Sequence, residues 1–308
     1  MVSVKDPFTT DDADHVPLGL SADLVDEIIV SAGDTEAILI GGQALGIWAD
    51  LLLDPELIDD LGGPITSKDV DFFGTEALAM ELARRLGGRI RVPDADDVAT
   101  PEAAIILFER KAKTIQVDIL GRLSGLSNRE VENGWVGLPY GTGEDVLIIR
   151  VMSPMGVLRS RISNIVTLKR SDPNALRQLR VAPYVVEAYI RQRLDGILSP
   201  RNTGNTEIKA SLRAGAQDTI KELIRHGRSH ELDRIYLDHG VDLLAHALAL
   251  ADHPAWEPRF AEFQVRKAAS DGITRREKRI AERERKDPGF SSVRPRPEAD
   301  SNDEPGPS

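Results

Sequence analysis

The chain has no cysteine and little aromatic content: its 308 residues include 7 Phe, 4 Tyr and 3 Trp. Without cysteine, disulfides, thiolate metal sites and cysteine nucleophiles are excluded. No apolar run approaches the roughly 20 residues that a bilayer-spanning helix needs. The opening stretch MVSVKDPFTTDDADHVPLGL also lacks the charged-then-apolar pattern of a secretory signal. We therefore expect a cytoplasmic protein without membrane contact.

Positive charge is scarce as well. The chain carries 39 Lys and Arg against 50 Asp and Glu, a formal net charge of −11. That balance argues against a general nucleic-acid coat protein but leaves room for a local basic groove. The six histidines contain no H-E-x-x-H motif, which argues against a zinc site of that kind. The 41% of hydrophobic residues suffices for two modest cores or one large one.

Hydrophobic periodicity divides the chain into a sheet region and a helical region. Strands are expected over 37–40, 68–74, 103–109, 114–121 and 145–154, and helices over 21–33, 43–53 and 75–88. From there the pattern is helical, over 155–168, 174–195, 206–226 and 229–250. We predict an α/β (α+β) fold in four parts: a flexible arm (1–18), a sheet domain (19–152), a helical domain (153–269) and a charged, disordered tail (270–308).

The tail lacks an apolar face. Residues 275–286 hold seven Lys or Arg and three Glu, and the segment that follows is rich in Pro, Ser and charge. This composition predicts a fraying charged helix followed by disorder. The alternative is a basic arm that touches RNA or DNA phosphates.

Two aspartates in the stretch PITSKDVDFFG are unusual for a strand. Asp69 and Asp71 alternate with apolar residues, although strands disfavour Asp and like charges on one face repel each other. Residues i and i+2 of a strand point to the same face, so a cation or a bound proton is needed to hold both carboxylates together. Asp118, between Val117 and Ile119 of the next expected strand, adds a third carboxylate.

Three carboxylates on neighbouring strands can hold two Mg²⁺ ions, or Mn²⁺ in their place, for an in-line displacement at phosphorus. We expect Asp69, Asp71 and Asp118 to converge at one mouth of the sheet. Each feature alone also has an ordinary explanation, since D-x-D triplets occur in solvated turns and single charges protect edge strands.

Gly41 and Gly42 follow an apolar strand and open a helix. Backbone N–H groups at such a helix start form an anion site, and glycine lets a phosphate approach closely. A lone Gly-Gly also occurs in ordinary turns. The stretch lacks both the six-residue Rossmann fingerprint and the Walker lysine, so neither a dinucleotide fold nor a P-loop is indicated.

Together, the segments LIGGQALGIWADLL, TSKDVDFFG and IQVDILG resemble the DNA polymerase β-like nucleotidyltransferase superfamily, nearest to its AbiEii/AbiGii toxin-like and MenT-like members. The shared pattern is a strand ending in Gly-Gly or Gly-Ser, a helix, an Asp-x-Asp strand and a later third Asp. It covers roughly residues 20–195. The resemblance implies a mixed sheet followed by a helical bundle, and Mg²⁺-dependent transfer of a nucleoside monophosphate from an NTP.

The resemblance also assigns roles to single residues. It implies metal binding and catalysis by Asp69, Asp71 and Asp118, and nucleotide binding by Gly41, Gly42 and Ser67. To the nucleotide site we add Lys68, which could offset the carboxylates or face solvent. We also add Arg159 and Arg161, which SPMGVLRSRISNI embeds in an apolar helix and which could instead form a solvated face.

Two departures from the superfamily pattern concern spacing and sequence. Gly42 and Asp69 are 69 − 42 = 27 positions apart, which implies an inserted loop, DPELIDDLGGPI. The stretch TLKRSDPNALRQLRVA also lacks the Arg-Asp element of the toxin-like relatives. A role as a toxin is therefore less firmly indicated than the metal site.

Two functions from different classes remain open. The first is a nucleotidyltransferase that modifies an acceptor hydroxyl of RNA, tRNA or protein, as part of a toxin–antitoxin or phage-defence system with a cognate antitoxin. Small-molecule adenylation is a variant for which the helical half shows no dedicated pocket. The second is a catalytically inactive relative that serves as a binding or regulatory protein.

Overall fold

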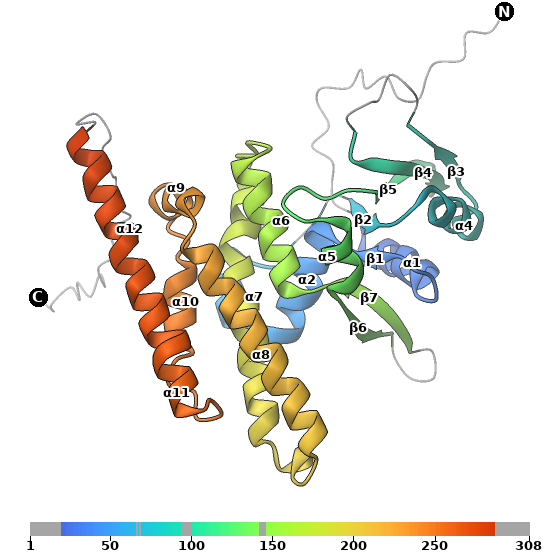
Figure 1. Ribbon diagram of the computed structural model, residues 1–308. Coiled ribbons are helices and arrows are strands. Elements are labelled where there is room, and N and C mark those ends of the chain that lie inside the picture. The colour runs from blue at the N-terminus through green and yellow to red at the C-terminus, as the bar shows by residue number, and fades with distance from the viewer. Residues whose placement is uncertain (1–19, 66, 68, 94–99, 142–145, 287–308) are drawn as a thin grey trace, which may run out of the picture.

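The computed structural model describes residues 20–65, 67, 69–93, 100–141 and 146–286 (Figure 1). The predicted arm and the part of the predicted tail beyond Lys286 lie outside these residues. Within them the chain forms one mixed sheet and a series of helices, so the predicted α/β fold with a following helical region is confirmed.

The sheet has seven strands in the order β3-β4-β5-β2-β1-β7-β6. Their bounds are β1 Ile38–Leu39, β2 Val70–Phe73, β3 Arg89–Arg91, β4 Glu102–Arg110, β5 Lys113–Leu120, β6 Trp135–Tyr140 and β7 Leu147–Met152. The pairs β2–β5 and β1–β7 are parallel, and the other neighbours are antiparallel. The strands expected over 103–109 and 114–121 are β4 and β5, and they pair antiparallel.

The helices of the sheet region are α1 Ala22–Ala32, α2 Gly41–Leu52, α3 Pro55–Asp60, α4 Glu76–Leu86 and α5 Asn128–Asn133. Helix α4 contacts β3 and β4, and α1 contacts α4 and β7. Along β5, Ile115, Val117 and Ile119 are buried, whereas Gln116 and Asp118 on the opposite face are more accessible. One face of the sheet is thus packed and the other holds polar side chains.

The helical region begins where Ser153 caps α6 by accepting a hydrogen bond from the Gly156 amide. Its elements are α6 Pro154–Val166, α7 Pro173–Leu198, η1 Pro200–Asn202, α8 Thr206–Gly227, α9 His230–His239, α10 Leu243–Ala249, α11 Pro258–Phe260, the π-helical turn η2 Ala261–Arg266 and α12 Lys267–Lys286. In Figure 1, α6, α7 and α8 stand beside the sheet and α12 lies farthest from it.

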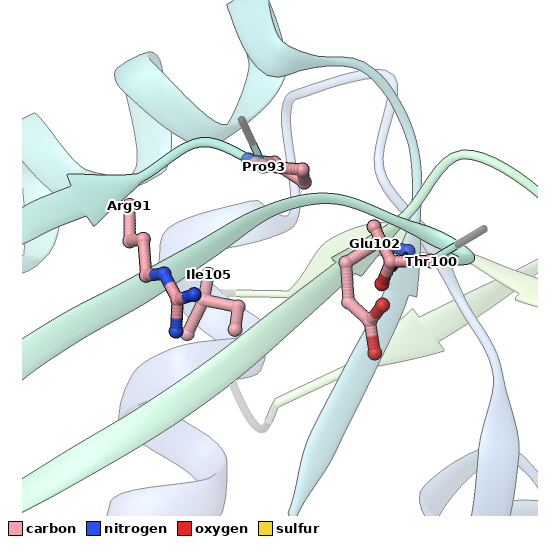
Figure 2. Close-up of a pocket in the computed structure, with 5 residues that line it drawn as sticks. All are labelled: Arg91, Pro93, Thr100, Glu102 and Ile105. Atoms are coloured by element: carbon pink, nitrogen blue, oxygen red, sulfur yellow. Dashed lines mark hydrogen bonds between the residues drawn. The ribbon is translucent and has the colours of Figure 1, made fainter. Parts of the chain in front are cut away.

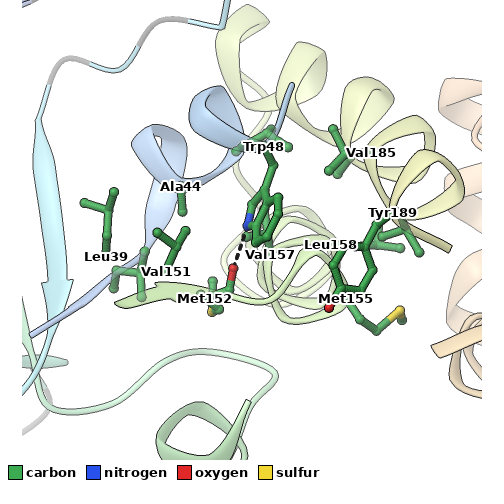
Figure 3. Close-up of a cluster of buried hydrophobic side chains, with 14 of the residues drawn as sticks. Leu39, Ala44, Trp48, Val151, Met152, Met155, Val157, Leu158, Val185 and Tyr189 are labelled. Carbon is green, nitrogen blue, oxygen red and sulfur yellow. Dashed lines mark hydrogen bonds between the residues drawn. The ribbon is translucent and has the colours of Figure 1, made fainter. Parts of the chain in front are cut away.

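Trp48 joins the two regions. Its indole Nε1 donates a 2.9 Å hydrogen bond to the carbonyl of Met152 at the end of β7, and its ring lies edge-on to Tyr189 of α7, 5.5 Å away. Figure 3 shows both rings in a buried cluster that includes Leu158 and Val185. Burying such aromatic side chains is worth a few kcal/mol each. This packing fixes α2 between the sheet and α7.

Three expectations about secondary structure are corrected. The short strands β3 and β6 were not expected. β3 is three residues long with two arginines, and β6 contains Gly137 and Pro139, which strands tolerate mainly at edges. Both strands occupy the edges of the sheet. The helix expected over 229–250 is two helices, because Gly240 adopts a left-handed conformation with φ 69° and ends α9.

The segment predicted as a disordered tail is also corrected over its first part. Residues 270–286 belong to α12, whose buried residues are Ala269, Gly272, Arg276 and Ile280. Arg276 donates 2.7 Å hydrogen bonds to both carboxylate oxygens of Asp242, and Arg279 donates hydrogen bonds of 2.6 and 2.7 Å to those of Asp233. The inward face of this helix is therefore held by charged pairs, which an analysis of apolar spacing does not detect.

Among the described helices, none combines the length and apolar character that a bilayer crossing requires.

The docking of α12 leads to a test of stability. Asp233 is fully buried, and Arg279 is the partner that compensates its charge. Arg279→Met should lower the free energy of unfolding by about 3 kcal/mol, the lower end for breaking a buried pair, because a fifth of the Arg279 side chain remains exposed. Urea denaturation measures the change. Arg283→Met, at an exposed position one turn farther along the same helix, should stay within about 0.5 kcal/mol of wild type; equal losses for both variants would contradict the structure.

Candidate functional site

The pairing of β2 with β5 brings two of the predicted aspartates together. Asp71 and Asp118 are direct partners in this parallel pair, so their side chains leave the same face of the sheet on neighbouring strands. Asp69 lies just before β2 and is exposed. Its charge nevertheless raises the pKa of both other carboxyl groups. The structure thus brings Asp71 and Asp118 together on one face, whereas the convergence of Asp69 with them stays a prediction.

Gly41 lies directly against Asp71. A Cβ at position 41 would overlap the Asp71 Oδ2 atom, and the backbone has a φ of 71°, which side-chain-bearing residues rarely adopt. The amide of Ile40 also donates a 3.0 Å hydrogen bond to the Asp71 carbonyl. Position 41 therefore needs glycine for two independent reasons, and the start of α2 is fixed beside the Asp71 carboxylate.

Gly42 faces two polar side chains from distant parts of the chain. A Cβ there would lie 2.8 Å from Gln178 Nε2 and 2.9 Å from Ser67 Oγ. Helix α2 begins at Gly41 with no side-chain cap and no acidic residue in its first turn. The start of α2 thus has the Asp71 carboxylate against Gly41, and the Ser67 hydroxyl and Gln178 amide against Gly42. An uncapped helix start suits an anionic ligand, and a cation on Asp71 would offset the repulsion between that ligand and the carboxylate.

Asp71 is the most perturbed acid of the site. Burial, reinforced by the charges of Asp118 and Asp69, raises its pKa to about 7, against the partial opposition of Arg161 and Arg170. The structure shows no hydrogen bond from any described residue to this carboxylate. A buried carboxylate without donors is unfavourable unless a cation or a proton compensates it.

Asp118 has a different environment. Burial raises its pKa, a 2.8 Å hydrogen bond from Gln116 Nε2 opposes that rise, and the charges of Asp69 and Glu102 add to it. Both carboxyl groups thus have raised pKa values. Perturbed acids that share a site are typical of functional centres, although structural clusters also produce them.

Two arginines of the helical region complete the site. Arg161 of α6 donates a 2.6 Å hydrogen bond to Gln178 Oε1, and burial lowers its pKa to about 10 although the charge of Asp71 opposes the shift. Its Nε is buried without a partner, and no ion pair joins it to Asp71, although both are described residues. The charge of Arg170 acts on both groups. The charges of Arg161 and Arg170 therefore act on the Asp71 carboxylate without an ion pair to it among the described residues.

Gln178 was not predicted. It is 4% exposed, and its Oε1 accepts the bond from Arg161 while its Nε2 is directed at Gly42. Within the part of the chain that the structure describes, Nε2 donates no hydrogen bond. The neighbouring Arg177 donates bonds of 2.6 and 2.7 Å to the carbonyls of Gly62 and Pro64. Helix α7 therefore supplies one donor to the site and anchors the inserted loop that leads to Ser67.

The structure does not bring Arg159 to this cluster. Its guanidinium pairs with Glu130 at 2.7 Å and Glu222 at 3.2 Å and donates to the carbonyl of Gly125. Two residues along a helix correspond to a rotation of about 200°, so Arg159 and Arg161 leave α6 on opposite sides. Arg159 has a structural role here. Lys68 lies outside the described residues.

The carboxylates of Asp71 and Asp118 are suitable ligands for one divalent cation. Among the described residues, no group of three or more His, Asp or Glu side chains is placed to hold a single ion. Mg²⁺, however, usually takes one or two protein carboxylates and completes its shell with waters and phosphates. Asp71 and Asp118 supply such a pair, and the half-buried Asp71 carboxylate, which accepts no hydrogen bond from a described residue, is the group that a cation would stabilise most. A second ion and ligation by Asp69 stay predictions.

Comparisons with known proteins identify no relative: no protein-family model, curated protein or solved structure matches the chain.

Proposed function

We propose that the chain is a Mg²⁺-dependent nucleotidyltransferase of the DNA polymerase β-like type. The observation that carries the proposal is the contact between Gly41 and Asp71, which sets an uncapped helix start against a half-buried carboxylate paired with Asp118. Phosphates and a divalent cation are the ligands that these two features bind, and an NTP with Mg²⁺ presents both at once.

In the proposed reaction, the acceptor hydroxyl oxygen forms a bond to the α-phosphorus of the NTP. The bond from that phosphorus to the bridging oxygen breaks, and pyrophosphate leaves with its electron pair. The first N–H groups of α2, Ser67 Oγ and Gln178 Nε2 would bind the phosphates, and Arg161 would face their charge. Asp118, whose pKa is raised, would accept the acceptor's proton. When bound to Asp71 and Asp118, Mg²⁺ polarises the reacting phosphate.

An inactive, ligand-binding relative is the second candidate. This candidate is favoured by the exposure of Asp69. It is also favoured because no three His, Asp or Glu side chains among the described residues are placed to bind one metal ion. Such a protein would bind Mg²⁺ and NTP without releasing pyrophosphate. The proposal includes an acceptor that is RNA, tRNA or protein, which labelling experiments test. It also includes membership of a toxin–antitoxin or phage-defence pair with a cognate antitoxin, which co-purification tests.

The first prediction concerns metal binding and pH. The pKa of Asp71 rises from 3.8 unfolded to about 7 folded, so its charge leaves stability unaffected below about pH 4 and destabilises the fold increasingly up to about pH 7. At pH 8 without metal, Asp71→Asn should therefore raise the melting temperature. In the wild type, Mg²⁺ with NTP should raise it through binding to the folded state, and Asp71→Asn should abolish that rise.

Calorimetry at pH 5 and pH 8 measures both effects. Asp218→Asn, an exposed acid on α8, is the matched control and should behave as the wild type. A wild-type melting temperature that Mg²⁺ and NTP leave unchanged would exclude the metal site.

The second prediction concerns turnover. Asp71→Ala and Asp118→Ala should each lower kcat at least about a hundredfold, the typical effect of losing a group that stabilises developing charge. Gly42→Val should instead raise KM for the NTP, because its side chain would displace Ser67 and Gln178. The assay is pyrophosphate release with each labelled NTP and total RNA. Full activity of Asp118→Ala would remove that residue from the mechanism, and folded wild type that binds NTP but never releases pyrophosphate would support the inactive relative.

A further inference from the structure

The contact between Arg161 and Gln178 has a fixed polarity. A guanidinium group has only donors, so the amide oxygen of Gln178 must be the atom that accepts the 2.6 Å hydrogen bond from Arg161 Nη1. The other end of the amide, Nε2, is therefore the end that faces Gly42. One side chain thus presents an acceptor to a cation and a donor to the start of α2.

Packing holds Gln178 in this position. It is almost fully buried, and the next residue of α7, Leu179, is fully buried. Helix α7 contacts both α2, which begins with Gly41 and Gly42, and α6, which carries Arg161. Gln178 therefore lies where the three helices meet, and its amide cannot turn away to solvent.

Arg161 has a second candidate partner, the Asp71 carboxylate. Both side chains are half-buried. The positive charge of Arg161 opposes the raised pKa of Asp71, and the negative charge of Asp71 opposes the lowered pKa of Arg161. Opposite charges at half-buried positions attract each other more strongly than in water, yet these two form no ion pair, although both are described. A restraint must hold the guanidinium away from the carboxylate.

The hydrogen bond to Gln178 is that restraint. Within the described part of the chain, Arg161 donates one other side-chain bond, to Ser160 Oγ, and at 3.4 Å it is long. The 2.6 Å bond to Gln178 is the short one, and hydrogen bonds from a charged donor are the stronger class. The position of the guanidinium therefore depends mainly on the Gln178 oxygen.

The other charges near the carboxylate pair cannot replace Arg161. Asp118 is influenced by further negative charge, including that of Glu102, which lines the pocket in Figure 2. Arg170 also acts on Asp71, but it is exposed, so water screens its charge. Arg161 is thus the half-buried cation that could neutralise Asp71 from within the protein.

We propose, on the basis of the proposed function, that Gln178 is a positioning residue that keeps Arg161 from pairing with Asp71. The carboxylate then stays open to a divalent cation, and the guanidinium stays available to phosphate. Without the Gln178 oxygen, Arg161 would turn to Asp71 and occupy the oxygens that a metal ion needs. A glutamate at position 178 would still hold Arg161, but it would present a carboxylate oxygen instead of an N–H donor to the start of α2.

Binding of Mn²⁺ alone, followed by the electron paramagnetic resonance signal of the free ion, tests the metal side without turnover. Gln178→Leu should weaken Mn²⁺ binding about tenfold, the lower end for a hydrogen bond between charged groups, because the new Arg161–Asp71 pair must first break. The double variant Gln178→Leu/Arg161→Met should restore at least wild-type affinity, since no guanidinium remains to compete. Gln192→Leu, exposed on the same helix, is the matched control and should leave the affinity unchanged.

Calorimetric titration with inorganic tripolyphosphate in the presence of Mn²⁺ tests the phosphate side. Gln178→Glu should bind Mn²⁺ at least as tightly as wild type, because it still holds Arg161. It should bind tripolyphosphate about tenfold more weakly, because a negative group replaces the donor beside Gly42. This separation of the two affinities decides the question even where circular dichroism shows that Gln178→Leu does not fold.

Two results would show that Gln178 has only a structural role: a Mn²⁺ affinity lost in Gln178→Leu that the double variant does not recover, or one lost equally in Gln178→Glu. A wild type that binds Mn²⁺ and tripolyphosphate, together with a folded Gln178→Leu variant that binds Mn²⁺ just as tightly, would overturn this inference and leave the proposed function in place. A wild type that binds neither probe nor any NTP would overturn the proposed function itself.

Discussion

The position of Trp48 is the constraint on which the rest of the site depends. Its indole hydrogen-bonds the last carbonyl of β7, and its ring packs against Tyr189. Helix α2, β7 and α7 are therefore fixed relative to one another inside a close-packed core, where small displacements are resisted. Each of these elements leads to the site: α2 begins with Gly41, β7 continues into α6 with Arg161, and α7 carries Gln178. A buried contact that does not touch the ligand groups thus sets the distances between them.

This rigidity explains how unfavourable charges persist at the centre. Asp71 is half-buried, lies opposite another carboxylate and meets the backbone of Gly41. Arg161 is also desolvated and keeps an unpaired Nε, yet the two groups form no ion pair. Opposite charges would approach each other if the backbone allowed it. The surrounding core holds them apart, and a site that is unfavourable when empty gains most from a ligand that brings both a cation and phosphate oxygens.

The parts of the site that follow from local patterns could be predicted from the sequence. An apolar strand ending in Gly41–Gly42, the alternation of Asp69 and Asp71 with apolar residues, and Asp118 within a β-branched run are all visible over a few residues. Gln178 was not predictable in this way, because its position 136 residues beyond Gly42 depends on how α7 packs (178 − 42 = 136). The separation of Arg159 from Arg161 was available from helical geometry. A charged helix was predicted over 275–286, but the packing of α12 was not, because its inward face, at Ala269, Gly272, Arg276 and Ile280, includes glycine and a paired arginine in place of large apolar residues.

The order of the strands also determines which elements lie on each side of the carboxylate pair. Because β2 and β5 run parallel, Asp71 and Asp118 stand side by side, with β1 and the start of α2 beyond Asp71 and with β4 and β3 beyond Asp118. Under the proposed function, the nucleotide would therefore bind on the Gly41 side of this carboxylate pair. The same arrangement would reconcile a net charge of −11 with the polyanionic nucleotide of the proposed function. Screening limits long-range repulsion to about 8–10 Å at physiological salt, so a few arginines placed within that distance decide binding more than the charge of the whole chain.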